Sequence, residues 1–564
     1  MTRFRRFLDA VDERTGYRGL LALALDEPIP GGARWAYVFG SALVGVLAIQ
    51  IVTGLCLMAV YSPSAAAAWG SVWWIENRVT LGWLVRGMHH HAASAMVVVL
   101  AAHLLQVAIY GAYKKPREAN WLLGIGLLSV TMGLALTGYL LPWDQKGFWA
   151  TQVATSIAGT VPVIGRSLER LLVGGAEYGT PTLTRFYALH VGVLPASLVL
   201  LLVAHVYLFR RHGVTPPASA DVSKVGRFHP DQLLRDLAAV FVCLAFAVGM
   251  AVRGHGAPLD APADPSSDYA ARPDWYFLFL FQLLKYFDGP LEVVGTVVLP
   301  GLAMAWLTLL PWIDRAEGRA IRGRLVPVGS IAVGTLAVVV LTVLAVRDDG
   351  GDARLQERFA RANALAARAN VLASRGIPPE GAQELLARDP QTRGPELFAE
   401  HCEACHGLGG WRRPEAKKAS DLAGFGSAAW VKALVRDPNA ERFFGHTKLR
   451  GMEPFAPEDL PDGDLDAVAA HVAGEDSARG RAVFQEKCIG CHLWNGQGRD
   501  LGLADGPELR GWASRDWIRG QLLDAAHPSR YGVENEMPRF GDRMDAGELE
   551  VLVEFVRTLR SPQE

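Results

Sequence analysis

Two short strings in the C-terminal third of the chain have the residue types and spacing for covalent attachment of a cofactor. Each string has two thiols separated by two residues and followed at once by an imidazole; the residues are Cys402, Cys405 and His406, then Cys488, Cys491 and His492. In c-type haem attachment the thiols bond the haem vinyl groups and the histidine is the proximal ligand. Zinc sites and redox-active cysteine pairs use similar spacing, but the further ligand clusters and the βαβ pattern that they need are not seen. We therefore predict two covalently bound haems c.

The two strings belong to an internal repeat. Arg393, Gly394 and Phe398 precede the first string, and the same residue types recur 86 positions later before the second string. Repetition at one offset indicates two copies of one small domain. We place these domains at residues 394–474 and 475–564, after a charged, Ala/Arg-rich helical linker at residues 348–393.

Methionines later in each copy can supply the sixth ligand of a haem iron. Met452 follows His406 by 46 residues, and Met537 follows His492 by 45 residues. A thioether ligand raises the reduction potential of a haem. The nearly equal intervals predict Met452 for the first copy and Met537 for the second, with Met544 as a weaker competitor.

Four histidines lie in long apolar stretches nearer the N-terminus, where an ionisable side chain is costly and usually functional. His89 and His103 are 14 residues apart, nearly four whole helical turns, so they share one face of a helix at two levels about 21 Å apart. His190 and His205, 15 residues apart in a second stretch, roughly match these levels. Two helices that each offer one imidazole per level can ligate two haems. We therefore predict two non-covalent haems b.

Glycines repeat the histidine spacing. Gly40 and Gly54 lie in one apolar stretch and Gly124 and Gly138 in another, each pair 14 residues apart. A residue without a side chain admits the close approach of a flat macrocycle, although small residues also favour ordinary helix packing in membranes. The shared interval favours a notch for haem at each level.

Hydropathy places these residues in a membrane. The chain is 50% hydrophobic with a mean hydropathy of +0.17, and seven uncharged stretches have about the 20 residues that cross a bilayer, or nearly so. They are residues 35–61, 88–113, 121–143, 186–209, 237–252, 293–313 and 325–346. Four clusters of Lys and Arg, at residues 3–6, 114–117, 210–227 and 315–324, fall on one side, which is then cytoplasmic. An odd number of crossings exports the repeat.

Five strings carry a family resemblance, and in chain order they are RGMHHHAAS, YKKPREANW, GYLLPWDQKGFWA, PTLTRFYALH and RPDWYFLFLFQ. Residues 17–346 resemble the cytochrome b of the cytochrome bc1 and bf complexes, which are quinol-oxidising, proton-translocating electron-transfer enzymes. The resemblance is closer to the bf branch, in which a four-helix and a three-helix subunit correspond to residues 1–230 and 231–347 of this single chain. That branch attaches a further haem through a cysteine where this chain has Val38, so no covalent haem is expected in the membrane part.

The resemblance implies how the histidines pair. It makes His89 and His190 the ligands of one haem b near the outer face, and His103 and His205 the ligands of the other near the inner face. Arg86, three residues before His89, resembles an arginine that pairs with a haem propionate.

The resemblance also implies two quinone sites. Four residues stand where the family has Pro-Glu-Trp-Tyr at its quinol-oxidising site, and they are Pro273, Asp274, Trp275 and Tyr276. A carboxylate there can accept a quinol hydroxyl proton as the electrons leave, and the string PWDQ at residues 142–145 begins the opposing loop. On the inner side Arg210 and Asp236 resemble positions near the quinone-reducing site, although positive-inside topology would equally explain Arg210.

The predicted fold is all-α: a seven-helix transmembrane bundle holding two haems b, followed by two small α-helical cytochrome c domains. The predicted function is oxidation of menaquinol or ubiquinol with proton translocation and electron transfer to a c-type acceptor, as the cytochrome b/c subunit of a bc-type respiratory complex. The alternatives are a transmembrane haem conduit without bifurcated quinol oxidation, and a haem-based redox sensor.

The predicted partners follow from this function. The sequence has no Cys-rich Rieske motif, so we expect a separate Rieske iron–sulfur subunit, and a cytochrome c or an oxidase as electron acceptor. The family resemblance implies a homodimer. We expect a bacterial cytoplasmic membrane protein with its N-terminus in the cytoplasm and its cytochrome c domains in the periplasm. A net charge of -1 excludes nucleic acid as a partner.

Overall fold

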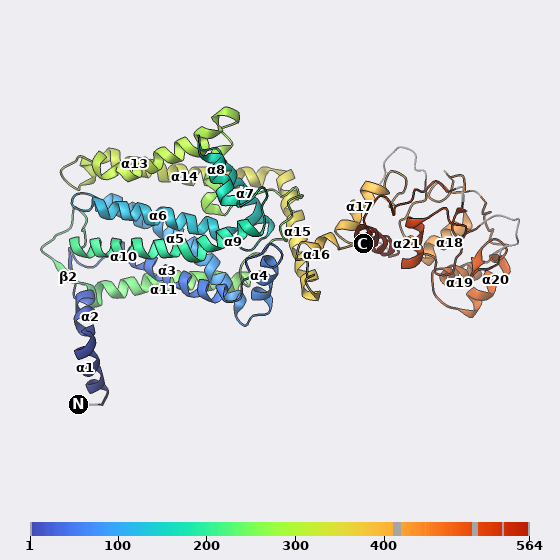
Figure 1. Cartoon of the computed structure of the whole chain (residues 1–564), viewed down its shortest axis with the longest axis horizontal. Helices are drawn as coiled ribbons and strands as arrows, with labels where there is room; N and C mark the ends of the chain where they lie inside the picture. The colour runs from blue at the N-terminus through green and yellow to red at the C-terminus, as the bar shows by residue number, and fades with distance from the viewer. Residues whose placement is uncertain are drawn as a thin grey trace. The chain divides into compact units, whose positions relative to one another are not determined.

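The chain forms two compact units, Met1–Gln383 and Glu384–Glu564 (Figure 1). The structure is a computed structural model that describes residues 3–409, 419–445, 447–449, 451–498, 506–532 and 535–561.

The first unit is built from long apolar helices. Among the described residues seven helical spans are long and apolar enough to cross a membrane, and only 6% to 22% of each apolar window is buried, which leaves broad faces for lipid. The spans are Trp35–Met58, Gly82–Tyr110, Glu118–Tyr139, Thr180–His212, Phe228–Gly254, Gly289–Ile313 and Leu325–Gly351. The predicted seven-helix bundle is therefore confirmed.

The spans consist of η1 (Trp35–Tyr37) and α3 (Val38–Met58); α5 (Gly82–Tyr110); α6 (Glu118–Tyr139); α9 (Thr180–Ala188), η2 (Leu189–Val193) and α10 (Leu194–His212); η3 (Phe228–Gln232) and α11 (Leu233–Gly254); η5 (Gly289–Leu291), η6 (Val294–Val298) and α13 (Leu299–Ile313); and α14 (Leu325–Gly351). Shorter elements flank them, namely α1 (Arg3–Thr15), α2 (Tyr17–Leu25), β1 (Pro28–Pro30), α4 (Ala68–Asn77), α7 (Gln145–Gly159), α8 (Gly165–Val173), β2 (Val225–Arg227), η4 (Trp275–Phe277), α12 (Leu278–Leu284), η7 (Ile321–Gly323) and α15 (Ala353–Arg375). Strands β1 and β2 pair antiparallel.

Two helix groups form the centre of the bundle. Helices α3, α5 and α11 pack on one another, and α6 packs on α10. Histidines on α5 and on η2–α10 thus come from different groups, as two-helix ligation of a cofactor requires.

A widened turn interrupts the fourth span at His190. Residues Leu189–Val193 form a π-helical turn, which holds one more residue than an α turn. The extra residue explains why His190 and His205 are 15 residues apart while His89 and His103 are 14 apart. Both intervals return their two imidazoles to one helix face.

A buried charge network fastens the C-terminal three-helix part to α5. Asp314, between α13 and α14, accepts hydrogen bonds from Tyr113 Oη at 2.6 Å and Arg324 Nε at 2.7 Å, and Lys114 Nζ lies 2.9 Å from it. Arg324 is fully buried and also donates to Ala108 O at 2.6 Å, near the end of α5.

The second unit consists of short helices around one aromatic core. The helices are α16 (Glu384–Ala387), α17 (Arg393–His401), α18 (Ala428–Arg436), α19 (Asp462–Val472), α20 (Ala478–Lys487), α21 (Arg515–Leu523) and α22 (Ala546–Thr558), and strand β3 (Leu493–Trp494) pairs with β4 (Gln497–Gly498). Phe398 and Trp430 of the first copy share this core with Phe484 and Trp517 of the second.

The two copies exchange helix partners inside this unit. Helix α17 of the first copy packs against α22 of the second, where the rings of Phe398 and Phe555 are 5.9 Å apart. Helix α20 of the second copy packs against α19 of the first, where a Cβ added to Gly480 would lie 2.6 Å from His471 Cβ. The boundary after residue 474 stays a prediction, and the helices of the two copies interleave in space.

Candidate functional site

His89 on α5 and His190 in η2 lie close together. Their ring centroids are 6.3 Å apart and the ring planes make an angle of 74°. An iron between two imidazoles needs two metal–nitrogen bonds of about 2 Å each, plus the two ring radii, which accounts for this separation. The two rings are therefore placed for one bis-imidazole iron.

Hydrogen bonds orient most of these rings. Three Nδ1 atoms lie within 3.1 Å of an oxygen, and the pairs are His89 with Thr53 Oγ1, His190 with Leu134 O, and His205 with Asn120 O. A ligating histidine commonly uses its second nitrogen in this way, which leaves Nε2 for the metal. Among the described residues the buried Nδ1 of His103 has no partner.

The four predicted glycines lie against the four rings. An added Cβ would meet a ring atom at 3.6 Å for Gly40 and His103, 3.2 Å for Gly54 and His89, 3.5 Å for Gly124 and His205, and 2.6 Å for Gly138 and His190. The last distance is shorter than Cβ contacts in real proteins, so Gly138 tolerates no side chain without a shift of its neighbours. The glycines repeat the histidine spacing because each makes room for a candidate ligand ring.

Arg86 is engaged by protein groups. Its guanidinium lies 3.0 Å from Glu76 Oε2 and donates to Ala257 O and Pro258 O at 2.7 Å each. These contacts attach α5 to α4 and to the loop after α11. The propionate role of Arg86 stays a prediction.

Two loops that are remote in sequence meet beside α5. Gln145 N–H donates to Ala261 O at 2.9 Å, and Ala263 N–H donates to Trp143 O at 3.1 Å. The string PWDQ is thereby held against the segment that leads to Asp274.

Asp274 closes the contact between these loops. Lys146 Nζ, in the first turn of α7, lies 2.8 Å from Asp274 Oδ1, and Tyr276 Oη donates to Asp274 Oδ2 at 3.3 Å. Trp275 Nε1 lies 3.4 Å from Ser94 Oγ on α5, so the group sits at the end of α5 that carries the first histidine level. Pro273 is buried.

Opposing effects set the charge of Asp274. Burial is the largest single effect and raises the pKa, but the Lys146 ammonium and smaller effects of neighbouring groups together lower it by more, so the pKa lies below the ordinary carboxyl value. The side chain, 17% exposed, is therefore ionised at neutral pH and can accept a proton or a hydrogen bond. Asp144 differs, because burial raises its pKa to about 6 and its Oδ1 caps α7 by accepting from Gly147 N–H at 2.8 Å.

The predicted inner-site residues have separate partners. Buried Asp236 accepts hydrogen bonds from Ser41 Oγ at 2.7 Å and Gln232 Nε2 at 2.8 Å. Arg210 forms an ion pair with Glu27. Ser41 follows the glycine of the second histidine level, so Asp236 lies beside that level.

The sequence alone does not predict roles for Lys146 and Glu27. Lys146 lies within the string GYLLPWDQKGFWA, but its partner Asp274 is 128 positions away. Glu27 precedes the first span, and its partner Arg210 follows the fourth. The only sequence feature that could have predicted such an ion pair is an acidic residue on the same side of the membrane as a cluster of basic residues.

Both cysteine strings adopt the same turn. In each string the histidine N–H donates to the carbonyl oxygen of the first cysteine, at 2.8 and 3.0 Å. His406 Nδ1 lies 2.8 Å from Ser420 O, and His492 Nδ1 lies 3.1 Å from Pro507 O. Burial also lowers the pKa of His406, so this ring is neutral with Nε2 left for a metal.

The thiols do not fit the alternative chemistries. Burial raises the pKa of Cys402 to about 12 and that of Cys488 to about 11, whereas redox-active and metal-bound thiols have lowered pKa values. No three His, Cys, Asp or Glu side chains gather into a metal-binding group within the part of the chain that the structure describes. Thioether attachment of haem fits these neutral thiols better.

The two candidate methionines lie in neighbouring segments. Both are partly buried, and Met537 Sδ accepts a hydrogen bond from Gln521 Nε2 on α21 at 3.6 Å. Lys448, before Met452, forms a 2.6 Å ion pair with Glu536, before Met537.

Four family models match the chain in succession. The model described as cytochrome b/b6/petB matches residues 24–213, and cytochrome b(C-terminal)/b6/petD matches residues 262–360. Cytochrome C oxidase, cbb3-type, subunit III matches residues 389–472, and cytochrome c matches residues 477–560.

Similar proteins include a menaquinol:cytochrome c reductase cytochrome b subunit of Geobacillus thermodenitrificans, 43% identical over 38% of this chain and 98% of the relative. Cytochrome b of Rhodobacter capsulatus is 31% identical over 54% of this chain and 76% of its own length. A solved chain of a hyperthermophilic respiratory Complex III aligns with a TM-score of 0.54 and 27% identity, covering 65% of this chain and 97% of that chain.

Proposed function

The chain belongs to the cytochrome b/b6 family, and from that premise we propose that it oxidises quinol as the cytochrome b/c subunit of a bc-type respiratory complex. Two similar proteins are menaquinol:cytochrome c reductase subunits, so menaquinol is the first candidate substrate and ubiquinol is the alternative. Cytochrome c domains follow the cytochrome b part in the same chain, and they supply the route to a c-type acceptor.

The contact between Lys146 and Asp274 carries the proposal. It joins two loops at the end of α5 that holds the first histidine level, and the aromatic rings of Trp275 and Tyr276 adjoin it. A haem conduit without quinol chemistry needs no carboxylate there.

Asp274 is the proposed proton acceptor. Lys146 keeps the carboxylate ionised before quinol binds, and Tyr276 Oη steadies Oδ2. A quinol hydroxyl can then donate to the carboxylate and pass it a proton as the electrons leave. If this loop faces outward, as the charge pattern predicts, that proton is released outside and the reaction translocates protons.

The proposed cofactors are two haems b and two haems c, which supply one-electron transfer when bound. The b haems are assigned to His89 with His190 and to His103 with His205. The c haems are assigned to the two cysteine strings, with His406 and His492 as proximal ligands and Met452 and Met537 as the thioether candidates.

The proposed assembly requires further chains. A Rieske iron–sulfur subunit would take one electron of each quinol while the haems b take the other, and a homodimer is the expected form. The proposed location is the bacterial cytoplasmic membrane, with the cytochrome c domains in the periplasm. Arg210 and Asp236 remain the candidates for a second, quinone-reducing site near the inner histidine level.

Asp274→Asn tests the proposed proton acceptor. Asn keeps the size and much of the hydrogen bonding of Asp but cannot take up a proton at neutral pH. A general base contributes about 10²–10⁴ in rate, so haem b reduction by quinol should slow by that factor in stopped-flow experiments, with all haems retained.

The matched control is Asp264→Asn. Asp264 lies in the same loop, and its Oδ1 accepts hydrogen bonds from Ser266. This variant should reduce haem b at the unmodified rate. A change under about threefold in Asp274→Asn would be too small for a general base and would move the role to another group.

A further inference from the structure

In the second unit, ion pairs at equivalent positions join the first helix of each copy to the last helix of the other copy. Arg393 at the start of α17 lies 2.8 Å from Glu548 on α22. Arg479, its counterpart 86 residues later on α20, lies 2.6 Å from Asp464 on α19. Each attachment string directly follows its helix, so each begins against the C-terminal helix of the other copy.

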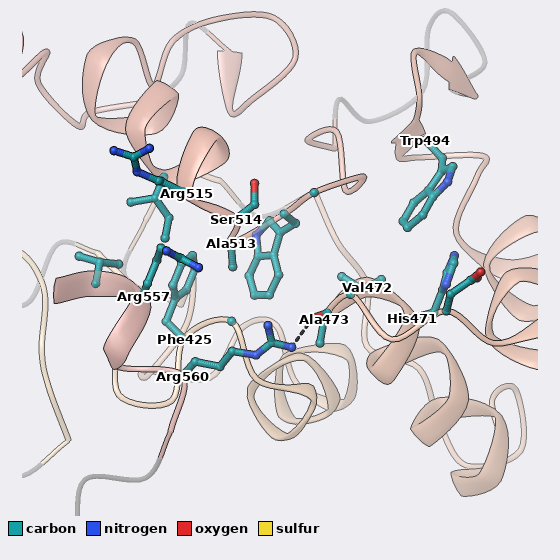
Figure 2. Close-up of a pocket in the computed structure, with 17 residues that line it drawn as sticks. Phe425, His471, Val472, Ala473, Trp494, Ala513, Ser514, Arg515, Arg557 and Arg560 are labelled. Atoms are coloured by element: carbon teal, nitrogen blue, oxygen red, sulfur yellow. Dashed lines mark hydrogen bonds between the residues drawn. The ribbon is translucent and has the colours of Figure 1, made fainter. Parts of the chain in front are cut away.

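Aromatic contacts continue this exchange beyond the helices. The ring of His401, directly before Cys402, is 6.4 Å from that of Phe540, three residues after Met537. Trp494, two residues after His492, stacks on His471 of α19 with ring centroids 4.4 Å apart (Figure 2).

Each methionine segment stays with the later helices of its own copy. Phe540 N–H donates to Leu522 O of α21 at 2.9 Å, and α21 packs on α22. Phe455 N–H donates to Val435 O of α18 at 3.1 Å, and α18 packs on α19. Helix α22 packs on α17, so the segment of Met537 lies on the side of the first cysteine string. Helix α19 packs on α20, so the segment of Met452 lies on the side of the second cysteine string.

The chain crosses over at equivalent turns. The rings of Phe425 and Trp512 pack edge to face with centroids 4.9 Å apart, and a Cβ added to Gly426 would lie 3.0 Å from Ala513 Cβ. Gly426 and Ala513 both have positive φ, 86° and 57°. In each copy this turn connects the segment that follows the cysteine string to the next helix, α18 or α21. The two copies of the chain therefore cross at these turns.

Contacts around the crossing join both copies. Arg560, after α22, donates to Ala473 O at the end of α19, beside a cavity that residues of both copies line (Figure 2). The first copy also makes a contact within itself next to the crossing. Asp421 N–H, before the turn, donates to Arg442 O, after α18, at 2.8 Å.

We infer that the two haem sites of the second unit exchange their thioether ligands. The haem on Cys402 and Cys405 takes Met537, and the haem on Cys488 and Cys491 takes Met452. The intervals in the sequence alone predict the opposite pairing. The inference rests on the proposed c-type haem ligation and is independent of quinol oxidation.

Chains with a single attached haem test the pairing. Cys402→Ser with Cys405→Ser leaves the haem of the second string. In that background Met452→His should abolish the thioether charge-transfer band and lower the potential, since imidazole is the stronger donor to ferric iron, while Met537→His should change neither. Removing the second string instead should reverse the dependence.

Two outcomes overturn the inference. In one, each remaining haem responds to the methionine of its own copy. In the other, neither methionine alters either spectrum, which also ends the proposal of thioether ligation but leaves quinol oxidation by haem b unaffected.

Disulfide trapping in the full chain tests the exchange without removal of a haem. Gly394→Cys with Phe555→Cys should form a disulfide between α17 and α22, because a Cβ at residue 394 would lie against the Phe555 Cβ, and peptide mapping under non-reducing conditions would detect it. The matched control is Gly394→Cys with His471→Cys, which would join α17 to α19 of its own copy and should stay reduced. A disulfide in the control pair, or no disulfide between α17 and α22, contradicts the exchange.

Discussion

The two units hold their candidate haem ligands by opposite means. In the first unit the histidines lie on long helical spans that pack side by side, and hydrogen bonds to helix backbone or hydroxyl groups orient three of the four rings. In the second unit the ligands lie on turns and loops between short helices, and two copies of the chain interleave. A non-covalent haem is retained by its ligands and the packing around it. A covalent haem stays attached through its thioether bonds even before the loops bring its second axial ligand into place.

The two units are also stabilised by different interactions. Broad apolar faces and a few buried polar groups hold the first unit, with Asp314 and Arg324 at one end. A dense core of aromatic side chains holds the second. Substitutions of buried charged residues should therefore lower the stability of the first unit most. In the second unit, small changes next to the haem ligands should mainly shift the haem potentials.

The largest expected effect is loss of a haem from the first unit. His190→Leu should remove one haem b, so a pyridine haemochrome assay should show the ratio of b to c haem falling by about half. In contrast, His406→Leu should leave its haem covalently attached and visible by haem staining, with a high-spin spectrum. His91→Leu, on α5 but without a predicted ligand role, is the control and should keep the full content. Retention of all haem b in His190→Leu would break the comparison.

A smaller effect is expected from the buried charge network. Asp314→Asn leaves Arg324 as an uncompensated buried charge, which typically costs about 3–5 kcal/mol. The midpoint of thermal loss of the haem b signal should fall markedly. Asp268→Asn removes an ion pair to Arg358 whose Asp side chain is 92% exposed, and it should change little. Equal shifts in the two variants would contradict the assigned role of the network.

The smallest expected effect concerns the two methionine segments. Gln521 donates a hydrogen bond to Met537 Sδ, while the equivalent residue of the first copy is Leu434. A hydrogen bond to the sulfur weakens its donation to ferric iron, so Gln521→Leu should lower the potential of one haem c modestly. Leu434→Gln should raise the potential of the other. Redox titration that finds the same haem shifted by both variants would rule out separate sites.

Regular spacing explains why much of the first unit could be predicted. Helical periodicity converts intervals of 14 residues into shared faces, so the histidine levels, their glycines and the seven spans follow from the sequence. The 15-residue interval of the fourth span required a π-helical turn, which the sequence does not reveal.

Contacts between distant segments explain the remainder. The pairing of Lys146 with Asp274 and that of Glu27 with Arg210 depend on how helices pack, and no local pattern predicts them. The repeat predicted two cytochrome c domains, and two family models match this part of the chain in succession. Its spacing cannot tell whether α17 packs on α19 or on α22, because the copies share the same residue types at the equivalent positions of their first helices.

Oxidant-induced reduction of haem b is the most direct test of bifurcated quinol oxidation. The complete complex would be mixed with excess quinol while an inhibitor blocks the inner quinone site, and an oxidant of the iron–sulfur partner would then be added. If the two electrons of quinol separate at the site that contains Asp274, the oxidant should cause further reduction of haem b, and Asp274→Asn should slow that reduction. If the oxidant only oxidises haem b, the chain is a haem conduit and the proposed function is contradicted.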